Sequence, residues 1–262
     1  MKAVQLTALL ASAAFAVSSA SGQIAVTQAN VFQESFGDLP DGTTITTENT
    51  DLTYVRVGTQ GGSIQAQNPS SFDAGASLFL SGPSGGSLNG IGAFDLPSSE
   101  VYELAFDFRL ANTDGTFVFG VGEGTSFTGN GTFNTNQGLF WLQVNGGELQ
   151  RRTGSWVDLE TLSTDTNYSI RVVANATESA IIYDSIAIAS GSMSIFLNGS
   201  NIAEDVPVTT ELSASAFRMY SVSGANYEID NIAVAIPEPS TYAALFGALA
   251  LGMVVFLRRR RR

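Results

Sequence analysis

The stretch Val101-Tyr-Glu-Leu-Ala-Phe-Asp-Phe-Arg-Leu110 decides the fold class. Large apolar side chains stand at every second position: Tyr102, Leu104, Phe106, Phe108 and Leu110. Because successive side chains of a β-strand point to opposite faces, this alternation predicts a long strand with one face in the core. Asn112-Thr-Asp-Gly115 supplies turn residues, and Thr116–Val121 repeats the alternation, so the two segments predict a hairpin.

Eight further segments rich in β-branched and aromatic residues alternate with turn residues. They are Leu52–Val57, Ala76–Leu80, Leu139–Val144, Tyr168–Ala174, Ile181–Ala189, Met193–Leu197, Ala216–Ser221 and Tyr227–Ala235. No stretch of the body has a helical period with caps. Ten or more strands in about 200 residues predict an all-β fold of two packed antiparallel sheets over residues 23–236. We interpret the Gly-rich segments Gly58–Asn68 and Ser81–Gly90 as turns, and Gly122–Gly138 as a long polar loop.

Three pieces of this body resemble a concanavalin A-like jelly roll, the fold of laminin-G-type and legume-lectin-like domains. They are Tyr168-Ser-Ile-Arg-Val-Val-Ala174, Met193-Ser-Ile-Phe-Leu-Asn-Gly199 and Tyr227-Glu-Ile-Asp-Asn-Ile-Ala-Val-Ala235. The resemblance implies that the last strand returns to pair near the opening segment Val31–Phe36.

The composition excludes most catalytic classes. The chain of 262 residues has no cysteine and no histidine, which removes disulfides, ordinary zinc sites and Ser-His-Asp triads. Its net charge is −12, although the basic run Arg258–Arg262 offsets part of the acidity. The body is therefore strongly acidic, which excludes nucleic-acid binding and suits binding of a divalent cation.

The N-terminal residues 1–22 have the organisation of a secretory signal peptide. One positive charge at Lys2 precedes a short Ala- and Leu-rich run, which ends in small residues around Ala20. The run is too short for a lasting membrane span. We therefore expect the body to be exported.

The C-terminal residues 237–262 combine three features in order. Pro237-Glu238-Pro239 precedes the uncharged span Thr241–Leu257, and Arg258–Arg262 follows it. As a helix the span would cover roughly 26 Å, and the arginines would orient the C-terminus toward the cytoplasm. This end resembles the PEP-CTERM sorting signal of Gram-negative bacteria. The resemblance implies recognition by an exosortase-type protease, transient anchoring in the inner membrane, and delivery to the cell surface or an extracellular polysaccharide matrix.

Paired carboxylates are the remaining catalytic option. Jelly-roll glycoside hydrolases place three acids on one strand, and Glu228-Ile-Asp230 begins such a pattern. Asn231, Ile232 and Ala233 follow, so the third acid is missing. We therefore do not expect a catalytic site, and we keep a carboxylate-based hydrolase or lyase as the alternative.

A structural Ca²⁺ site is a second hypothesis for the acids. In many jelly-roll carbohydrate-binding modules, an acid near the first strand and an aspartate of the final strand share one calcium ion. By this resemblance Glu34, Asp38 and Asp230 would be the ligands, and carboxylates are ligands that calcium prefers. The alternative is that Asp230 is a solvated residue of an edge strand.

Aromatic residues indicate where a sugar would bind, because a ring face stacks on the apolar face of a pyranose. Trp156 follows two arginines in Arg151-Arg152-Thr-Gly-Ser-Trp156, and Tyr183, Tyr220 and Phe127 are further candidates. Trp141 lies in an apolar run, so we interpret it as a core residue. The sequence predicts a surface-targeted, non-enzymatic binding or structural protein, with contact to polysaccharide; an inert structural role is the third interpretation.

Overall fold

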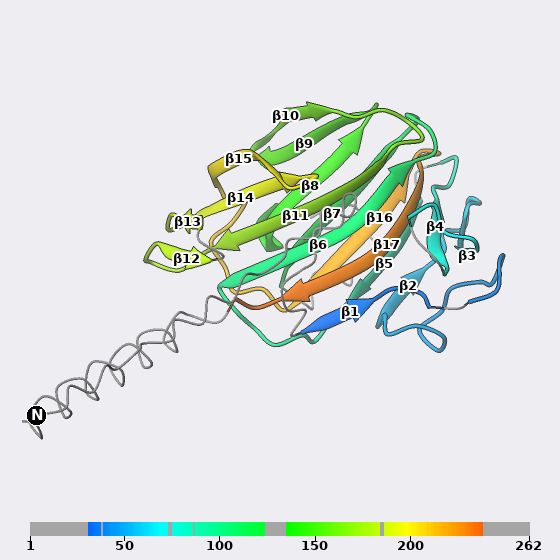
Figure 1. Cartoon of the computed structure of the whole chain (residues 1–262), viewed down its shortest axis with the longest axis horizontal. Helices are drawn as coiled ribbons and strands as arrows, with labels where there is room; N and C mark the ends of the chain where they lie inside the picture. Colours follow the sequence, from blue (N-terminus) through cyan, green and yellow to red (C-terminus); the bar gives the residue numbers. More distant parts are fainter. Residues whose placement is uncertain are drawn as a thin grey trace, which may run out of the picture.

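The computed structural model describes residues 31–37, 39–72, 75–85, 87–123, 135–183 and 186–237. Two antiparallel sheets pack face to face, and the helical structure within the described ranges is one 3₁₀ turn, η1 (Thr135–Gln137). Figure 1 shows the sheets lying one over the other, with β12 and β13 at one end of β11 and β14. The predicted all-β sandwich is confirmed.

Sheet A contains eight strands. Their order is β15 (Ser200–Pro207), β14 (Ser192–Leu197), β11 (Asn167–Asn175), β6 (Val101–Leu110), β17 (Asn226–Ala235), β4 (Ser77–Ser81) and β3 (Ser63–Gln67), with β1 (Phe32–Glu34) also paired to β17. A separate hairpin consists of β12 (Ile181–Tyr183) and β13 (Ile186–Ile188).

Sheet B contains seven strands. Their order is β10 (Ser155–Thr161), β9 (Glu148–Thr153), β8 (Gly138–Asn145), β7 (Thr116–Gly122), β16 (Ala216–Val222), β5 (Leu88–Ala93) and β2 (Tyr54–Arg56). β7, β8, β9 and β10 are consecutive in sequence and neighbours in space; short turns join β8 to β9 and β9 to β10, whereas residues 123–137 separate β7 from β8.

Aromatic rings from both sheets fill the core between them. The Phe106 ring of β6 meets the Phe119 ring of β7 edge to face, with centroids 4.9 Å apart. Phe117 of β7 stacks on Tyr227 of β17 at 4.5 Å. Such pairs add to the hydrophobic gain from burial. The alternating residues of Val101–Leu110 therefore hold sheet A against sheet B, as the sequence pattern predicts.

The closing strand returns to the opening one. β1 pairs with β17 in antiparallel register, with Phe32 opposite Val234 and Glu34 opposite Ile232. β14 and β15 are joined by a turn in which Asn198 and Gly199 have φ values of 49° and 81°. Positive φ at both central residues is typical of a tight hairpin turn, which Asn-Gly adopts at little cost. The expected return of the last strand to the opening segment is confirmed.

Three local expectations were wrong. Ile181–Ala189 forms two short strands of a hairpin rather than one strand, and its outward residue Ile182 is 72 % exposed. The Gly-rich segments Gly58–Asn68 and Ser81–Gly90 contain β3 and the start of β5. β3 pairs with β4 and β5 pairs with β16, and that pairing outweighs their weak intrinsic preference for strand.

Several sequence expectations lie outside the described residues. They are the signal peptide 1–22, Asp38, Glu238 and Pro239, the span 241–257, and residues 124–134 of the polar loop. Within the described ranges, no helix is long and apolar enough to cross a membrane.

Candidate functional site

Each sheet has an inner face in the core and an outer face turned away from it. Residues directly opposite each other in antiparallel strands share a face. In sheet A, the row Glu103–Val173 and the row Ala105–Arg171 therefore lie on the outer face. Its charged residues on β6, β11 and β17 are Glu103, Asp107, Arg109, Arg171, Glu228 and Asp230.

A buried ion pair holds the β12–β13 hairpin on this outer face. The Arg171 guanidinium donates from Nε to Glu103 Oε1 at 2.8 Å, and the Tyr183 hydroxyl donates to the other Glu103 oxygen. Arg171 also lies 5.3 Å from the centre of the Tyr183 ring. Burial and the hydrogen bond to Glu103 raise the pKa of Tyr183 above its ordinary value. Tyr183, predicted as a ligand-binding residue, is thus an anchor of the hairpin.

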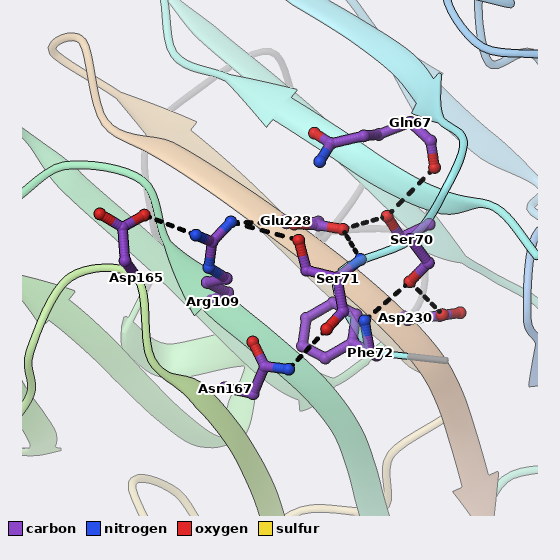
Figure 2. A network of polar contacts seen from close by, with 10 residues as sticks. Gln67, Ser70, Ser71, Phe72, Arg109, Asp165, Asn167, Glu228 and Asp230 are labelled. Atoms are coloured by element: carbon purple, nitrogen blue, oxygen red, sulfur yellow. Dashed lines mark hydrogen bonds and ion pairs between the residues drawn. The ribbon is translucent and has the colours of Figure 1, made fainter. Parts of the chain in front are cut away.

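A second network closes the other end of the same face (Figure 2). The Glu228 carboxylate accepts from the Ser71 backbone N–H at 2.7 Å and from the Ser77 hydroxyl at 2.6 Å. Arg109 pairs with Glu228 at 3.6 Å and with Asp165 at 2.7 Å. Asn167 donates to the Ser71 carbonyl oxygen at 2.7 Å. The loop that contains Ser71 is therefore fixed over β17, and Glu228 is 2 % exposed.

Asp230 belongs to this closed region. It lies directly opposite Asp107 in the β17–β6 pairing, and both carboxylates are buried. A bulge follows Asp230, where Asn231 has a φ of 51° and donates from Nδ2 to Asp107 at 2.8 Å. Ser70 donates its hydroxyl to Asp230 at 3.3 Å. The Glu228–Asp230 pattern therefore lies beneath a loop rather than in an open cleft.

Of the predicted calcium ligands, Glu34 and Asp230 lie on opposite faces of sheet A, and Asp38 lies outside the described residues. Glu34 faces the same side as the core residue Ile232, whereas Asp230 is on the outer face. Both Glu34 oxygens accept backbone N–H groups, from Phe36 and Asp51, at 2.7 Å. Glu34 lines a hollow of about 480 Å³. Among the described residues no group of three or more acids is placed to hold a metal ion, so calcium binding stays a prediction, testable by a chelator-sensitive melting temperature.

The outer face of sheet B has a different character. A cluster of apolar side chains lies on it, formed by Leu88, Val118, Trp141, Ala216 and Tyr220, with Phe94, Trp156 and Val222 against them. Glycines let large side chains lie across the strands. A Cβ at Gly120 or Gly138 would collide with the Trp141 indole. Trp141 is thus buried, as expected, but against the outside of sheet B and not between the sheets.

The first edge of this face carries Trp156 and Arg152. The two residues are directly opposite each other in the β9–β10 hairpin, which turns at Gly154. The Arg152 guanidinium lies 5.3 Å from the centre of the Trp156 ring, a cation–π geometry. Both residues are partly exposed. Arg151 points to the opposite side of β9, the side of the core residue Leu149. Of the three predicted ligand-binding residues in this segment, Arg152 and Trp156 therefore share a face and Arg151 does not.

The second edge carries two arginines and two tyrosines, which we call the Arg56–Arg218 cluster: Tyr54, Arg56, Arg218 and Tyr220. Tyr54 and Arg218 each lie opposite Gly92, and Arg56 and Tyr220 each lie opposite Gly90. The Arg218 guanidinium lies 5.4 Å from the Tyr54 ring centre and 5.0 Å from that of Tyr220. Burial lowers the pKa of Arg218, and the neighbouring positive charge of Arg56 lowers it further.

Sequence reasoning missed the Arg56–Arg218 cluster. Its members come from strands separated by more than half of the chain, and single-sequence patterns do not pair such strands. One signal was present, namely Tyr54-Val-Arg56 and Arg218-Met-Tyr220, which alternate tyrosine and arginine with a spacing of two. In strands that spacing puts both side chains on one face.

Comparison with known families assigns the C-terminal end. Residues 235–262 match the PEP-CTERM protein-sorting motif. The motif is a sorting signal recognised by exosortase, and it marks this chain as an exported protein sorted to the cell surface. The match covers the tail alone. A search of curated proteins found no matching relative.

Comparison with solved structures supports the fold of the body. The chain resembles the endo-β-1,4-glucuronan lyase of the fungus Trichoderma reesei, with a TM-score of 0.51, 14 % identity, and 78 % of this chain and 94 % of that one covered. A galectin-like protein of unknown function from Bacillus subtilis gives 0.46 at 15 % identity, with 79 % and 100 % covered. A sialidase gives 0.46 at 9 % identity, with 70 % of this chain but 16 % of that chain covered. At 14 % identity the likeness to the lyase shows the fold alone.

Proposed function

We propose that this exported protein is a non-enzymatic glycan-binding module of the cell surface, which contacts extracellular polysaccharide through the Trp156–Arg152 edge of sheet B. The observation that carries the proposal is the stacking of Arg152 on a partly exposed Trp156 at the end of a rigid hairpin. The sorting motif supports it, because it marks the chain for export and sorting to the cell surface, where an extracellular polysaccharide would be within reach.

The chemistry of this edge suits a sugar. An indole face offers a flat apolar surface to the C–H groups of a pyranose ring, and a guanidinium donates to its hydroxyl and ring oxygens. Next to it on the same face, Gln143 donates to Gln150 at 2.5 Å, and Gln150 donates to Asp158 at 2.6 Å. These amides and the carboxylate are groups that fix hydroxyl orientation in binding sites.

The test is retention of the full-length chain, purified in detergent, on a panel of immobilised polysaccharides. Trp156→Ala is expected to weaken retention at least tenfold, because it removes about 1.4 kcal/mol or more of contact energy. Tyr183→Phe is the matched aromatic control, since Tyr183 is held by Glu103 on the far sheet. Equal retention of wild type and Trp156→Ala on every glycan that binds would reject this edge as the site.

A glycan-cleaving enzyme is the second candidate, because the lyase named above shares the fold. The buried carboxylates of this chain offer it little support. Glu228 is occupied by Ser71, Ser77 and Arg109, and the loop of Ser70 lies over Asp230. Incubation with the polysaccharides that the protein retains, followed by measurement of new reducing ends and of unsaturated products, separates binding from cleavage. If the wild type releases these products and the Glu228→Gln variant does not, the result would favour an enzyme.

A further inference from the structure

The Arg56–Arg218 cluster places two positive charges side by side with limited access to water. Arg218 is 3 % exposed and Arg56 is partly buried. The Nη1 atom of Arg56 is buried and has no hydrogen-bond partner among the described residues. Arg56 also forms no ion pair with any acid of the described ranges. A partly desolvated positive charge such as that of Arg56, with a second positive charge nearby, is unfavourable unless an anion compensates it.

The arginines of sheet A show the contrast. Arg171 and Arg109 lie on the outer face of that sheet, and both are paired with carboxylates of this chain, Glu103, Glu228 and Asp165. The chain is rich in acids, with a net charge of −12. Arg56 on the edge strand β2 pairs with none of the described acids, which indicates that its partner is an anion from outside the chain.

Two glycines of β5 form the floor of the cluster. Gly90 and Gly92 lie between β2 and β16 in the two rows that carry the cluster. A Cβ at Gly90 would come within 2.9 Å of the Met219 carbonyl oxygen and 3.0 Å of the Tyr220 Cβ. A Cβ at Gly92 would collide with the Phe217 carbonyl oxygen. Any larger residue at these two positions would displace the β16 backbone that carries Arg218 and Tyr220, so glycine is what allows β5 and β16 to pair closely beneath the cluster.

The guanidinium group of arginine favours carboxylate and sulfate groups as ligands. Its planar fork of N–H donors matches the two oxygens of a carboxylate or a sulfate, and charge-assisted bonds of this kind are roughly twice as strong as neutral ones. The Tyr54 hydroxyl, which accepts from Arg218 Nη2 at 3.5 Å, adds a polar group at the same edge. The tyrosine rings fix the Arg218 guanidinium from both sides, so little side-chain freedom remains to be lost on binding.

We propose that Arg56 and Arg218 form an anion subsite that binds the carboxylate or sulfate group of an acidic polysaccharide. The inference rests on the proposed glycan-binding function, and it adds the chemical class of the glycan. The subsite lies at the opposite edge of the sheet-B face from Trp156, roughly 29 Å away at the usual strand spacing of about 4.8 Å. Arg56 contacts the anion, and Arg218 supplies the second charge beneath it.

The experiment compares polymers that share a backbone and differ in charge. The full-length chain in detergent is tested with polygalacturonate against its fully methyl-esterified form, and with dextran sulfate against dextran. The charged member of at least one pair is expected to bind about tenfold more tightly or better. The pair that shows the difference identifies the group, carboxylate or sulfate.

Variants locate the subsite. Arg56→Gln is expected to remove the preference for the charged polymer and to leave retention of its uncharged partner unchanged. Arg56→Lys, which keeps the charge but loses the fork, is expected to keep only part of the preference. Arg151→Gln is the control, because it changes the net charge equally on the other side of sheet B. Circular dichroism verifies that each variant is folded.

The outcomes separate the two proposals. If uncharged glycans bind through Trp156 but charge makes no difference, or Arg56→Gln behaves like Arg151→Gln, the anion subsite is refuted and glycan binding stands. If Arg56→Gln removes charge selectivity while Trp156→Ala changes nothing, the subsite stands and the Trp156 edge is refuted. If a folded chain retains none of the four polymers, the anion subsite is refuted.

Discussion

The outer faces of the two sheets use the same residue types in opposite ways. On sheet A, arginines are paired with acids of the chain, and the β12–β13 hairpin and the Ser71 loop are fixed over them. On sheet B, arginines lie against aromatic rings at the two edges, with Arg152 on Trp156 and Arg218 between Tyr54 and Tyr220. The arginines of sheet A therefore stabilise the fold, whereas Arg152 and Arg56 of sheet B lie at a partly exposed surface.

This difference explains why composition alone was a poor guide to the site. The acids suggested catalysis or calcium, yet the described acids of sheet A serve mainly as partners for arginines, serines and backbone N–H groups. Buried carboxylates with several donors are typical of structural networks. The comparison therefore predicts that substitutions on sheet A change stability and that substitutions on sheet B change binding.

The largest effect is expected for Arg171→Ala. The substitution leaves the Glu103 carboxylate, which is fully buried, without its charged partner. We expect the free energy of unfolding to fall by about 3–5 kcal/mol, measured by urea denaturation. The double variant Glu103→Leu with Arg171→Met should recover most of the loss, because it removes both charges. A loss below about 1 kcal/mol for Arg171→Ala would contradict the structural role of the pair.

A smaller loss is expected for Glu228→Ala. Two donors, the Ser71 backbone N–H and the Ser77 hydroxyl, would lose their acceptor. The expected cost is about 1–3 kcal/mol, with faster hydrogen exchange at the Ser71 amide. The control Asp165→Ala removes an exposed partner of Arg109 and should cost about 0.2–1 kcal/mol. Unchanged exchange at Ser71 would show that Glu228 does not hold the loop.

Trp156→Ala is expected to cost less still in stability. The side chain is partly exposed at an edge strand, so its loss should lower the free energy of unfolding by about 1 kcal/mol or less. Together with a tenfold loss of glycan retention, this outcome would separate binding from folding on sheet B. A large loss of stability would instead make Trp156 a structural residue, like Tyr183.

The smallest effect concerns alkaline pH. The pKa of Tyr183 is raised in the folded protein, whereas in the unfolded chain it is about 10. Stability from this group is thus fully present below about pH 10 and is lost as the pH rises toward the folded pKa. Wild type should therefore lose melting temperature more steeply than Tyr183→Phe between about pH 10 and pH 11. Equal slopes would mean that Tyr183 ionises normally.

The alternation of hydrophobic residues predicted the fold because, in the long strands, the apolar face of the pattern is the face that packs in the core. Val101–Leu110 puts its large side chains in the core as its period requires, and in Tyr227–Ala235 the bulge after Asp230 shifts the alternation by one residue, so that Ile232 and Val234 also face the core. The same alternation indicated an exposed opposite face with Glu103 and Asp107, yet both are buried. The β12–β13 hairpin and the Ser71 loop, from distant parts of the chain, cover them, and the local sequence around Glu103 and Asp107 does not predict this burial.

The candidate site was predictable where it is local. Arg152 and Trp156 are four residues apart around Gly154, so a hairpin turn brings them together. Sequence spacing did not separate Arg151 from Arg152, although alternation sends them to opposite sides of β9. The Arg56–Arg218 cluster needed the pairing of β2, β5 and β16, which is long-range information.

The central claim is that the outer face of sheet B, and not that of sheet A, contacts the glycan. Hydrogen exchange of the full-length chain with and without a polysaccharide that it retains tests this claim directly. We expect slower exchange in the hairpin Glu148–Thr161, and no change in the hairpin Ile181–Ile188 on sheet A. Protection of the sheet A hairpin alone, with Glu148–Thr161 unchanged, would contradict the account.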